Sequence, residues 1–169
     1  MELIVAKNNQ NAIGKNGDLM WNLSKDLQHF RKLTQNQIVV MGRKTYDSLP
    51  GGPLKNRINV IITRNPNKYH QNVNNVYFIS LDESHRILME LQERYHKTIF
   101  IIGGSDIYKY FYPQCDILHI TEVDNDEEGD TYFPISEKQI SEDHVIKYKE
   151  THRDETTNML YSFCTYQKK

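Results

Sequence analysis

Apolar runs and helical patterns alternate along most of this chain of 169 residues. Six short runs, rich in β-branched residues and bounded by polar, Gly or Pro residues, are typical of buried strands. They cover residues 3–6, 38–41, 58–62, 76–79, 99–102 and 117–120. Helical patterns cover residues 24–33, 43–48, 81–95 and 105–111. Strands that alternate with helices indicate crossover connections, and hence an α/β fold with a largely parallel sheet and helices on its faces.

The last quarter of the chain has a different pattern. Residues 145–150 and 159–166 read as two long strands with no helix between them, which predicts an antiparallel pair at an edge of the sheet. The sequence contains no internal repeat and no interdomain linker, and its length is that of one domain. We therefore expect a single domain over residues 1–169.

Asp26 is the most informative single residue. In the predicted helix over residues 24–33, the apolar residues Leu23, Leu27 and Phe30 share one face, and Asp26 lies on that face as well. A carboxylate on the inward face is uncommon because burying an unpaired charge is costly, and no Arg or Lys is spaced to pair with it. An Asp in a first helical turn can instead serve the helix dipole and the free N–H groups. The segment alone leaves both interpretations open.

Three predicted strands end in groups that suit anions. One strand leads into Gly103-Gly104, a second into residues 42–45 (Gly-Arg-Lys-Thr), and a third into Thr63-Arg64. Each has an ordinary alternative, such as a tight turn or a basic first helical turn, although cations there oppose the helix dipole. The dinucleotide motif GxGxxG is absent. Because ligands of open α/β sheets bind beyond the carboxyl ends of strands, the three ends together indicate an extended ligand with several phosphates, such as a dinucleotide.

Composition narrows the class of protein. Lys and Arg total 21 against 22 acidic residues, a balance that argues against nucleic acid or a membrane surface as the main partner. The N-terminal residues lack a basic and a long apolar region, so we expect no signal peptide, and no apolar run could span a bilayer. Cys115 and Cys164 follow no metal-binding spacing, so we expect free thiols, no metal site and a cytoplasmic protein.

An ordered set of motifs along nearly the whole chain resembles the dihydrofolate reductase family, in its monomeric bacterial form. The set comprises Ile4-Val5-Ala6, Ile13-Gly14, Trp21-Asn22-Leu23 with Asp26-Leu27 and Phe30, Met41-Gly42-Arg43 with Thr45, Ser48-Leu49, Pro53-Leu54 with Arg57, Ile102-Gly103-Gly104 with Ile107-Tyr108, Thr121, and Gly129-Asp130-Thr131 with Phe133-Pro134. The resemblance implies a mixed, mostly parallel eight-stranded sheet with four main helices. It also implies NADPH-dependent reduction of 7,8-dihydrofolate and binding of antifolate inhibitors.

The resemblance also implies residue roles. Asp26 would accept two hydrogen bonds from the pterin, Thr121 would bond to Asp26, and Trp21 would help to shape the site of the water that protonates the substrate. Arg57 would hold the glutamate tail, within a substrate site formed by Ile4, Val5, Ala6, Leu27, Phe30, Leu49, Leu54 and Ile102. The residues expected at the cofactor are Ala6, Ile13, Gly14, Leu19, Gly42, Arg43, Lys44, Thr45, Ile62, Thr63, Arg64, Gly103, Gly104, Ser105 and Tyr108.

In the family a loop, here residues 9–23, closes over the nicotinamide, and Asp130 matches the residue that holds it. This chain departs from most relatives in having Met20 and Ser24 where Pro is common, a slightly longer turn at residues 50–52, and Asp106 where some relatives carry a cation. Ser24 is a good candidate for a helix N-cap. The Gly103–Gly104 peptide bond is cis in the family.

Two other functions compete with the reductase. A reductase of a pyrimidine sugar intermediate would keep the cofactor strand ends but would not need Asp26, Arg57 and Thr121 together. A folate- or nucleotide-binding module that regulates an RNA receives no support from the near-zero net charge. The absence of an exposed heptad pattern favours a monomer.

Overall fold

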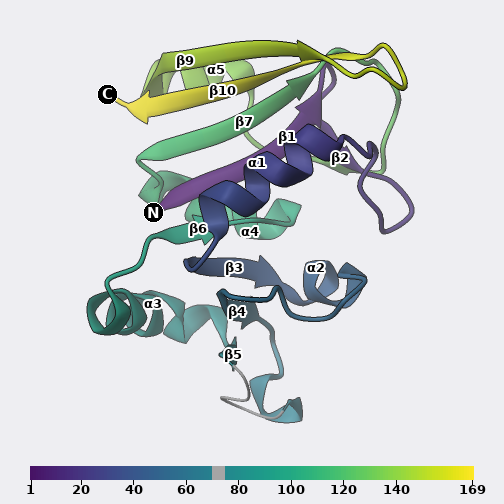
Figure 1. The fold of residues 1–169 in the computed structure, drawn as a ribbon. Helices are drawn as coiled ribbons and strands as arrows, with labels where there is room; N and C mark the ends of the chain where they lie inside the picture. Colours follow the sequence, from purple (N-terminus) through teal and green to yellow (C-terminus); the bar gives the residue numbers. More distant parts are fainter. Residues whose placement is uncertain (70–74) are drawn as a thin grey trace.

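A computed structural model describes residues 1–69 and 75–169 and has an α/β architecture built on one large sheet (Figure 1). Its strands are β1 (Glu2–Asn8), β2 (Ala12–Gly14), β3 (Ile38–Gly42), β4 (Ile58–Ile62), β5 (Val76–Ile79), β6 (Ile99–Ile101), β7 (Ile117–Val123), β8 (Thr131–Tyr132), β9 (His144–Arg153) and β10 (Leu160–Lys168). Its α-helices are α1 (Ser24–Thr34), α2 (Arg43–Ser48), α3 (Leu81–Tyr95), α4 (Ser105–Phe111) and α5 (Glu137–Asp143), and short 3-10 turns cover Pro66–Lys68 and Tyr112–Gln114.

The large sheet has eight strands in the order β5-β4-β3-β6-β1-β7-β10-β9. The strands from β5 to β7 pair in parallel, whereas β10 pairs antiparallel with both β7 and β9. The predicted eight-stranded, mostly parallel sheet with an antiparallel C-terminal pair is therefore confirmed. No helix among residues 1–69 and 75–169 is long and apolar enough to cross a bilayer.

Alternating side chains divide the core between the two faces of the sheet. In β1, Leu3 and Val5 pack on one face with residues of α3, α4 and α5, whereas Ile4 packs on the other face. That other face also receives Phe30 and Leu33 from α1 and Tyr46 from α2. The strands are buried on both faces, which explains why their sequences read as continuous apolar runs. In Figure 1, α1 crosses the front of the sheet and α4 lies behind it.

The sequence pattern did not predict helix α5 or the short strands β2 and β8. The structure has five α-helices in its described part, one more than expected, because α5 buries only Ile140 and so lacks an apolar stripe. Its start is stabilised by the Ser136 side chain, which accepts a hydrogen bond from the Gln139 N–H at 3.1 Å. The short pair β2–β8 forms a separate sheet. Ser24 does not cap α1, since the cap position is Leu23.

Asn59 joins β4 to the irregular segment before it. Its amide is buried, accepts a hydrogen bond from the Leu54 N–H and donates to the Leu54 carbonyl, both at 2.9 Å. A second donation reaches the Arg57 carbonyl at 3.3 Å. One side chain thus fixes the positions of Leu54 and Arg57. Cys115 and Cys164 are buried free thiols, as expected.

Substituting Asn59 with Ala should reduce the free energy of unfolding by about 2–4 kcal/mol, because the change leaves buried backbone groups of residues 54 and 57 without partners. Chemical denaturation measures the change. The exposed Asn67→Ala variant is the control and should stay within about 0.5 kcal/mol of the parent protein. Equal stabilities of the two variants would contradict this role for Asn59.

Candidate active site

Asp26 lies in the first turn of α1 and faces β7. Thr121, which is buried on β7, donates a hydrogen bond from Oγ1 to Asp26 Oδ1 at 2.7 Å. Burial raises the pKa of the Asp26 carboxyl, and the Thr121 hydrogen bond opposes that rise. Among the described residues, no Lys or Arg forms an ion pair with Asp26. The carboxylate is therefore an inward-facing acceptor, as its position in the helical pattern indicated.

Trp21 lies just before α1 and packs against the cluster formed by Leu23, Val123, Tyr161 and Phe163. Its indole nitrogen Nε1 is buried, and it is the one buried side-chain nitrogen or oxygen in the described part of the chain that has no protein partner. Buried N–H groups are normally satisfied, so an unpaired one at a site marks a position where a ligand or water can bind.

Five of the apolar residues expected around the substrate fall into one cluster. Ile4 belongs to the α1 face of the sheet, and Phe30, Leu49, Leu54 and Ile102 pack against the same cluster. Leu27 instead remains 45% exposed, one turn from the packed residues of α1. The predicted slot is thus formed on one side, and Leu27 borders it as an open apolar surface.

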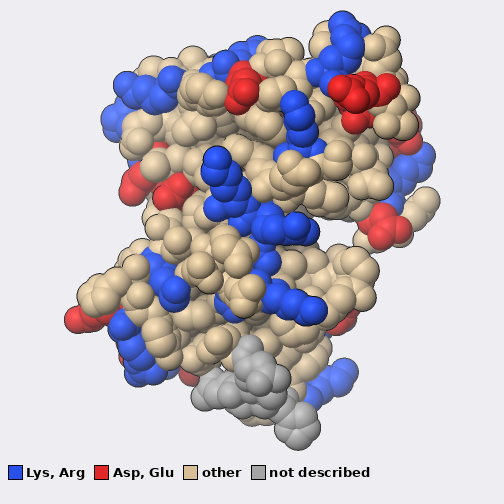
Figure 2. Space-filling view, in the orientation of Figure 1, with Lys and Arg blue, Asp and Glu red and all other residues tan. Residues whose placement is uncertain are grey.

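Arg57 extends from the end of the segment that Asn59 fixes. Its Nε donates to Thr34 Oγ1 at 3.2 Å, its Nη1 donates to the Lys55 carbonyl at 2.9 Å, and its guanidinium carbon lies 5.9 Å from the centre of the Phe30 ring. Partial burial, and then the charge of Arg31, lowers the pKa of Arg57. Figure 2 shows basic side chains gathered over the end of α1, which carries Arg31 and Lys32 in its last turn. This end of the site suits a carboxylate.

The two glycines after β6 permit close backbone contacts. The Gly103–Gly104 peptide bond is cis, as the resemblance implied, and the Gly42 N–H donates to the Gly103 carbonyl at 2.9 Å. Gly103 has φ +115°, and a Cβ there would lie 3.1 Å from the ring of Tyr108. Tyr108 in turn donates from Oη to the Ile4 carbonyl at 2.8 Å. The ends of β3 and β6 are therefore held together, and Tyr108 links this point to Ile4 within β1.

Not all cations at the strand ends are free to bind an anionic ligand. Arg43 pairs with Asp47 at 2.8 Å within α2, so the anion expected near this basic turn is a residue of the same helix. Lys44 and Arg64 are exposed, and neither α2 nor α4 has a side-chain cap at its first turn. Thr63 is buried, with its N–H bound to the Ile79 carbonyl. Thr45 lies beside Gly104, where a Cβ would be 3.5 Å from Thr45 Oγ1.

Residues 9–23 form the segment that includes β2. Asp130 anchors it twice: Oδ2 accepts from the Asn16 N–H at 2.8 Å, and the Asp130 N–H donates to the Gly14 carbonyl at 2.9 Å. Met20 packs on the loop of residues 124–130, which contains Asp130, since a Cβ at Gly129 would lie 3.1 Å from the Met20 sulfur. Leu19 is 70% exposed. An indentation of the surface separates this segment from α2 (Figure 2).

The structure brings most predicted residues together, but not all of their side chains. Val5 and Ile62 belong to the cluster on the opposite face of the sheet, so only their backbones can reach a ligand on the α1 face. Ala6 pairs with Thr121 in the sheet, Ile13 packs at the edge of the α4 face, and Ser105 donates to the Tyr132 carbonyl at 2.8 Å.

Sequence reasoning missed Asn8, which connects residues 9–23 to the loop of residues 124–130 through hydrogen bonds. Its Oδ1 accepts from the Gln10 and Ala12 N–H groups, at 3.0 and 2.9 Å, and its Nδ2 donates to the Glu127 carbonyl at 2.7 Å. The available signal was the polar run that follows the first strand.

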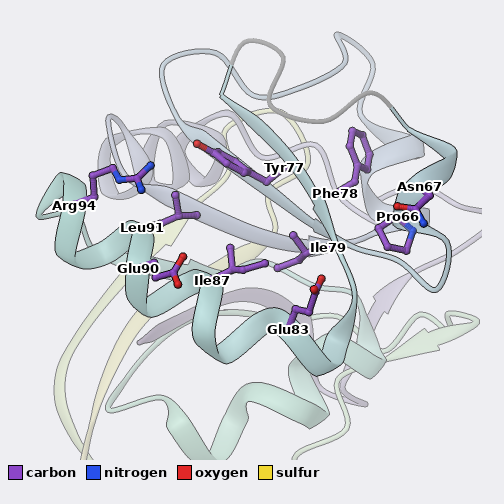
Figure 3. Close-up of a pocket in the computed structure, with 10 residues that line it drawn as sticks. All are labelled: Pro66, Asn67, Tyr77, Phe78, Ile79, Glu83, Ile87, Glu90, Leu91 and Arg94. Carbon is purple, nitrogen blue, oxygen red and sulfur yellow. The ribbon is translucent and has the colours of Figure 1, made fainter.

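A cavity of about 340 Å³ lies elsewhere, between β5 and α3 (Figure 3). The side chains of Ile79, Ile87 and Leu91 border it, with Tyr77 and Arg94 at one end. None of the predicted site residues is among the described residues that line it. The candidate site is therefore the region around Asp26 and the neighbouring strand ends.

Comparisons with known proteins agree with this geometry. A family model described as dihydrofolate reductase matches residues 1–168. Dihydrofolate reductase of Bacillus subtilis (strain 168) is 34% identical over 169 residues, which is 100% of this chain and 95% of the relative. Dihydrofolate reductase type 3 of Salmonella typhimurium is 38% identical over 134 residues, 79% of this chain and 78% of the relative.

A solved structure gives the same result. The dihydrofolate reductase of Enterococcus faecalis, in complex with NADP(H) and RAB-propyl, superimposes with a TM-score of 0.82 at 29% identity. The match covers 99% of this chain and 95% of that one. With its inward carboxylate on Thr121, its strand ends joined at Gly103, and these matches over its whole length, the chain belongs to the dihydrofolate reductase family.

Proposed function

We propose that this protein reduces 7,8-dihydrofolate to 5,6,7,8-tetrahydrofolate, with Asp26 as the residue that binds and orients the pterin. The hydride is added to C6 of the pterin, and N5 gains a proton. NADPH supplies the hydride when it is bound. The observation that carries the proposal is an inward-facing, partly buried carboxylate that has Thr121 as its hydrogen-bond donor but no cationic partner among the described residues. Such a group has room for the donors of a ligand.

The chemistry of a pterin completes this site. The ring presents an N–H and an exocyclic amino group side by side, and one carboxylate can accept from both. The carbonyl of Ile4, within β1, and that of Ile102, directly after the neighbouring β6, would flank the 4-position of the ring. Phe30, Leu49 and Leu54 would contact the aminobenzoyl group, with Leu27 closing the slot. The bidentate carboxylate thus fixes which edge of the pterin points inward.

Proton delivery would use water rather than direct transfer from Asp26. The unpaired indole N–H of Trp21 offers a hydrogen bond to such a water. The raised pKa of Asp26 keeps the site able to bind a proton closer to neutral pH than an exposed Asp could. Asp26 and Trp21 would therefore orient and polarise the water that protonates N5.

The residues at the strand ends suit NADPH. Gly42, Gly103 and Gly104 let the strand ends pack closely against α2 and α4, and Arg43, Lys44 and Arg64 supply positive charge for its phosphates. Thr45, Thr63, Ser105 and Tyr108 would add polar contacts, and Ala6, Ile13, Gly14, Leu19 and Ile62 would line the nicotinamide and adenine ends. Closure of residues 9–23, held by Asp130, would exclude water from the hydride transfer.

The proposal extends to the organisation of the protein. We expect one domain over residues 1–169, a monomer, a cytoplasmic location and inhibition by antifolates that carry a protonated diaminopyrimidine. The buried free thiols support a reducing compartment. Light scattering during size-exclusion chromatography would test the monomer.

Loss of NADPH absorbance at 340 nm on addition of dihydrofolate tests the function. The parent protein should turn over, and Asp26→Asn should lose about a hundredfold or more in kcat/KM at neutral pH, because the amide cannot accept from both pterin donors. A pyrimidine sugar reductase would leave dihydrofolate unreduced, and a binding module would show no oxidation of NADPH at all. Near-parent activity of Asp26→Asn would remove Asp26 from the role of pterin anchor.

Asp26→Asn should also stabilise the ligand-free protein in a pH-dependent way. The raised pKa of Asp26 means that its protonated form favours the folded state, so stability is present below about pH 4 and is lost as the pH rises through the folded-state pKa. The Asn variant does not titrate and should retain that stability. The melting temperature of Asp26→Asn should therefore exceed that of the parent protein, and the difference should grow as the pH rises above about 4. A constant difference, or a less stable Asn variant at neutral pH, would contradict the burial argument.

Arg57→Leu should raise the KM for dihydrofolate about thirtyfold with little change in the hydride step, because a remote charge pair acts equally on ground and transition states. The loss corresponds to about 2 kcal/mol, the lower end for a partly desolvated charge pair. The control is a pterin substrate without the glutamate tail, which both proteins should use equally well. If both substrates lose the same affinity, Arg57 supports the fold instead.

The protein should prefer NADPH to NADH by about a hundredfold or more, because a phosphate beside arginines gains charge-assisted hydrogen bonds of about 1.5–3 kcal/mol each. Arg64 should contribute most, since Arg43 already pairs with Asp47. Arg64→Ala should reduce the ratio of kcat/KM values for the two cofactors, whereas Lys68→Ala, an exposed cation nearby in the sequence, should not. Parity of NADPH and NADH in the parent protein would show that these cations do not bind the phosphate.

A further inference from the structure

Lys7 is a fully buried lysine that the proposed chemistry does not use. It lies on β1 beside Ala6, and its side chain is only about 2% exposed. In the parallel pair β1–β7, Ala6 is opposite Thr121 and Lys7 is opposite Glu122. Since side chains alternate along a strand, Lys7 points away from the Asp26 face of the sheet. A buried ammonium is costly unless it is paired and hydrogen-bonded, so its partners indicate what it does.

The Lys7 ammonium forms its hydrogen bond with Asn11, which belongs to residues 9–23, the segment that includes β2. Its Nζ donates to Asn11 Oδ1 at 2.9 Å, whereas Glu137 and Glu122 lie at 3.6 and 4.0 Å. A cavity of about 250 Å³ borders the two carboxylates, and Tyr166 donates to Glu122 at 3.4 Å. The acids offset the charge of Lys7 at longer range, and Asn11 is the partner at direct hydrogen-bond distance.

Asn11 sets the start of β2. It adopts a left-handed backbone conformation with φ 62°, its carbonyl accepts from the Phe133 N–H at 2.7 Å, and its side chain donates to the Ile135 carbonyl at 3.3 Å. The next residues are β2, Ala12–Gly14, which carries Ile13 and Gly14 toward the proposed cofactor. The position of the Asn11 side chain, which Lys7 fixes, therefore determines where β2 lies.

We propose that Lys7 is a positioning residue for the NADPH site: its buried ammonium holds Asn11 and thereby fixes β2 and the start of the segment over the active site. The inference rests on the proposed function, because Ile13 and Gly14 matter only if NADPH binds there. A purely structural Lys7 would change stability alone. A positioning Lys7 changes cofactor affinity in the folded protein, and it does so through Asn11.

Binding of NADPH without folate tests this, with fluorescence of Trp21, the only tryptophan, as the readout. Lys7→Met removes the charge at similar length, and Asn11→Gly removes the side chain but permits the left-handed backbone. Each should raise the NADPH dissociation constant about tenfold. The double variant should have about the same dissociation constant as the single variant that binds NADPH less tightly. The KM for dihydrofolate should change less than about twofold. Glu137→Gln, the control, removes a nearby carboxylate but keeps the Lys7–Asn11 bond and should bind NADPH as the parent does.

Two results would overturn the inference: parent-like affinity in folded Asn11→Gly, or fully additive losses in the double variant. If Lys7→Met does not fold, Asn11→Gly alone decides, with circular dichroism to verify its fold. Because the titration needs no turnover, a parent protein that binds NADPH but does not oxidise it refutes the proposed function and still tests Lys7.

Discussion

The hydrogen bond between Thr121 and Asp26 is the contact on which the site depends. It joins the first turn of α1 to β7, two elements nearly a hundred residues apart in the chain. Thr121 can reach Asp26 because β7 lies beside β1 and its residue opposite Ala6 faces α1. Since no Lys or Arg in the described part of the chain forms an ion pair with it, Asp26 is left as a partly buried acceptor, which costs stability in the ligand-free protein and favours a ligand with paired donors.

The same strands organise the rest of the site. The ends of β3 and β6 meet through Gly42 and Gly103, and Tyr108 packs on Gly103 and bonds to Ile4 of β1, so α4 and three strands converge in the region that would hold the cofactor. Specificity then depends on the charged residues around it. Their availability differs, since Arg43 is paired within α2 and Arg64 is exposed.

Adjacent residues of β1 serve opposite faces. Ala6 lies with Thr121 on the side of α1, whereas Lys7 lies with Glu122 beneath α5 and reaches Asn11. Residues 9–23 are consequently held from two directions, by Asp130 on one side and by Lys7 and Asn8 of β1 on the other. Rigid attachment at their base is compatible with motion farther along, where Leu19 is exposed.

Local pattern by itself determined the eight strands of the large sheet, the four predicted helices and the inward position of Asp26, because periodicity and β-branched runs report burial directly. It could not show α5, whose stability comes from a cap and one buried residue, or the burial of Lys7, which ended the predicted first strand because a charged residue reads as exposed. It also could not show that the side chains of Val5 and Ile62 face away from the site. Only the tertiary structure decides these features, because they depend on which elements pack together and on which partner each charge finds.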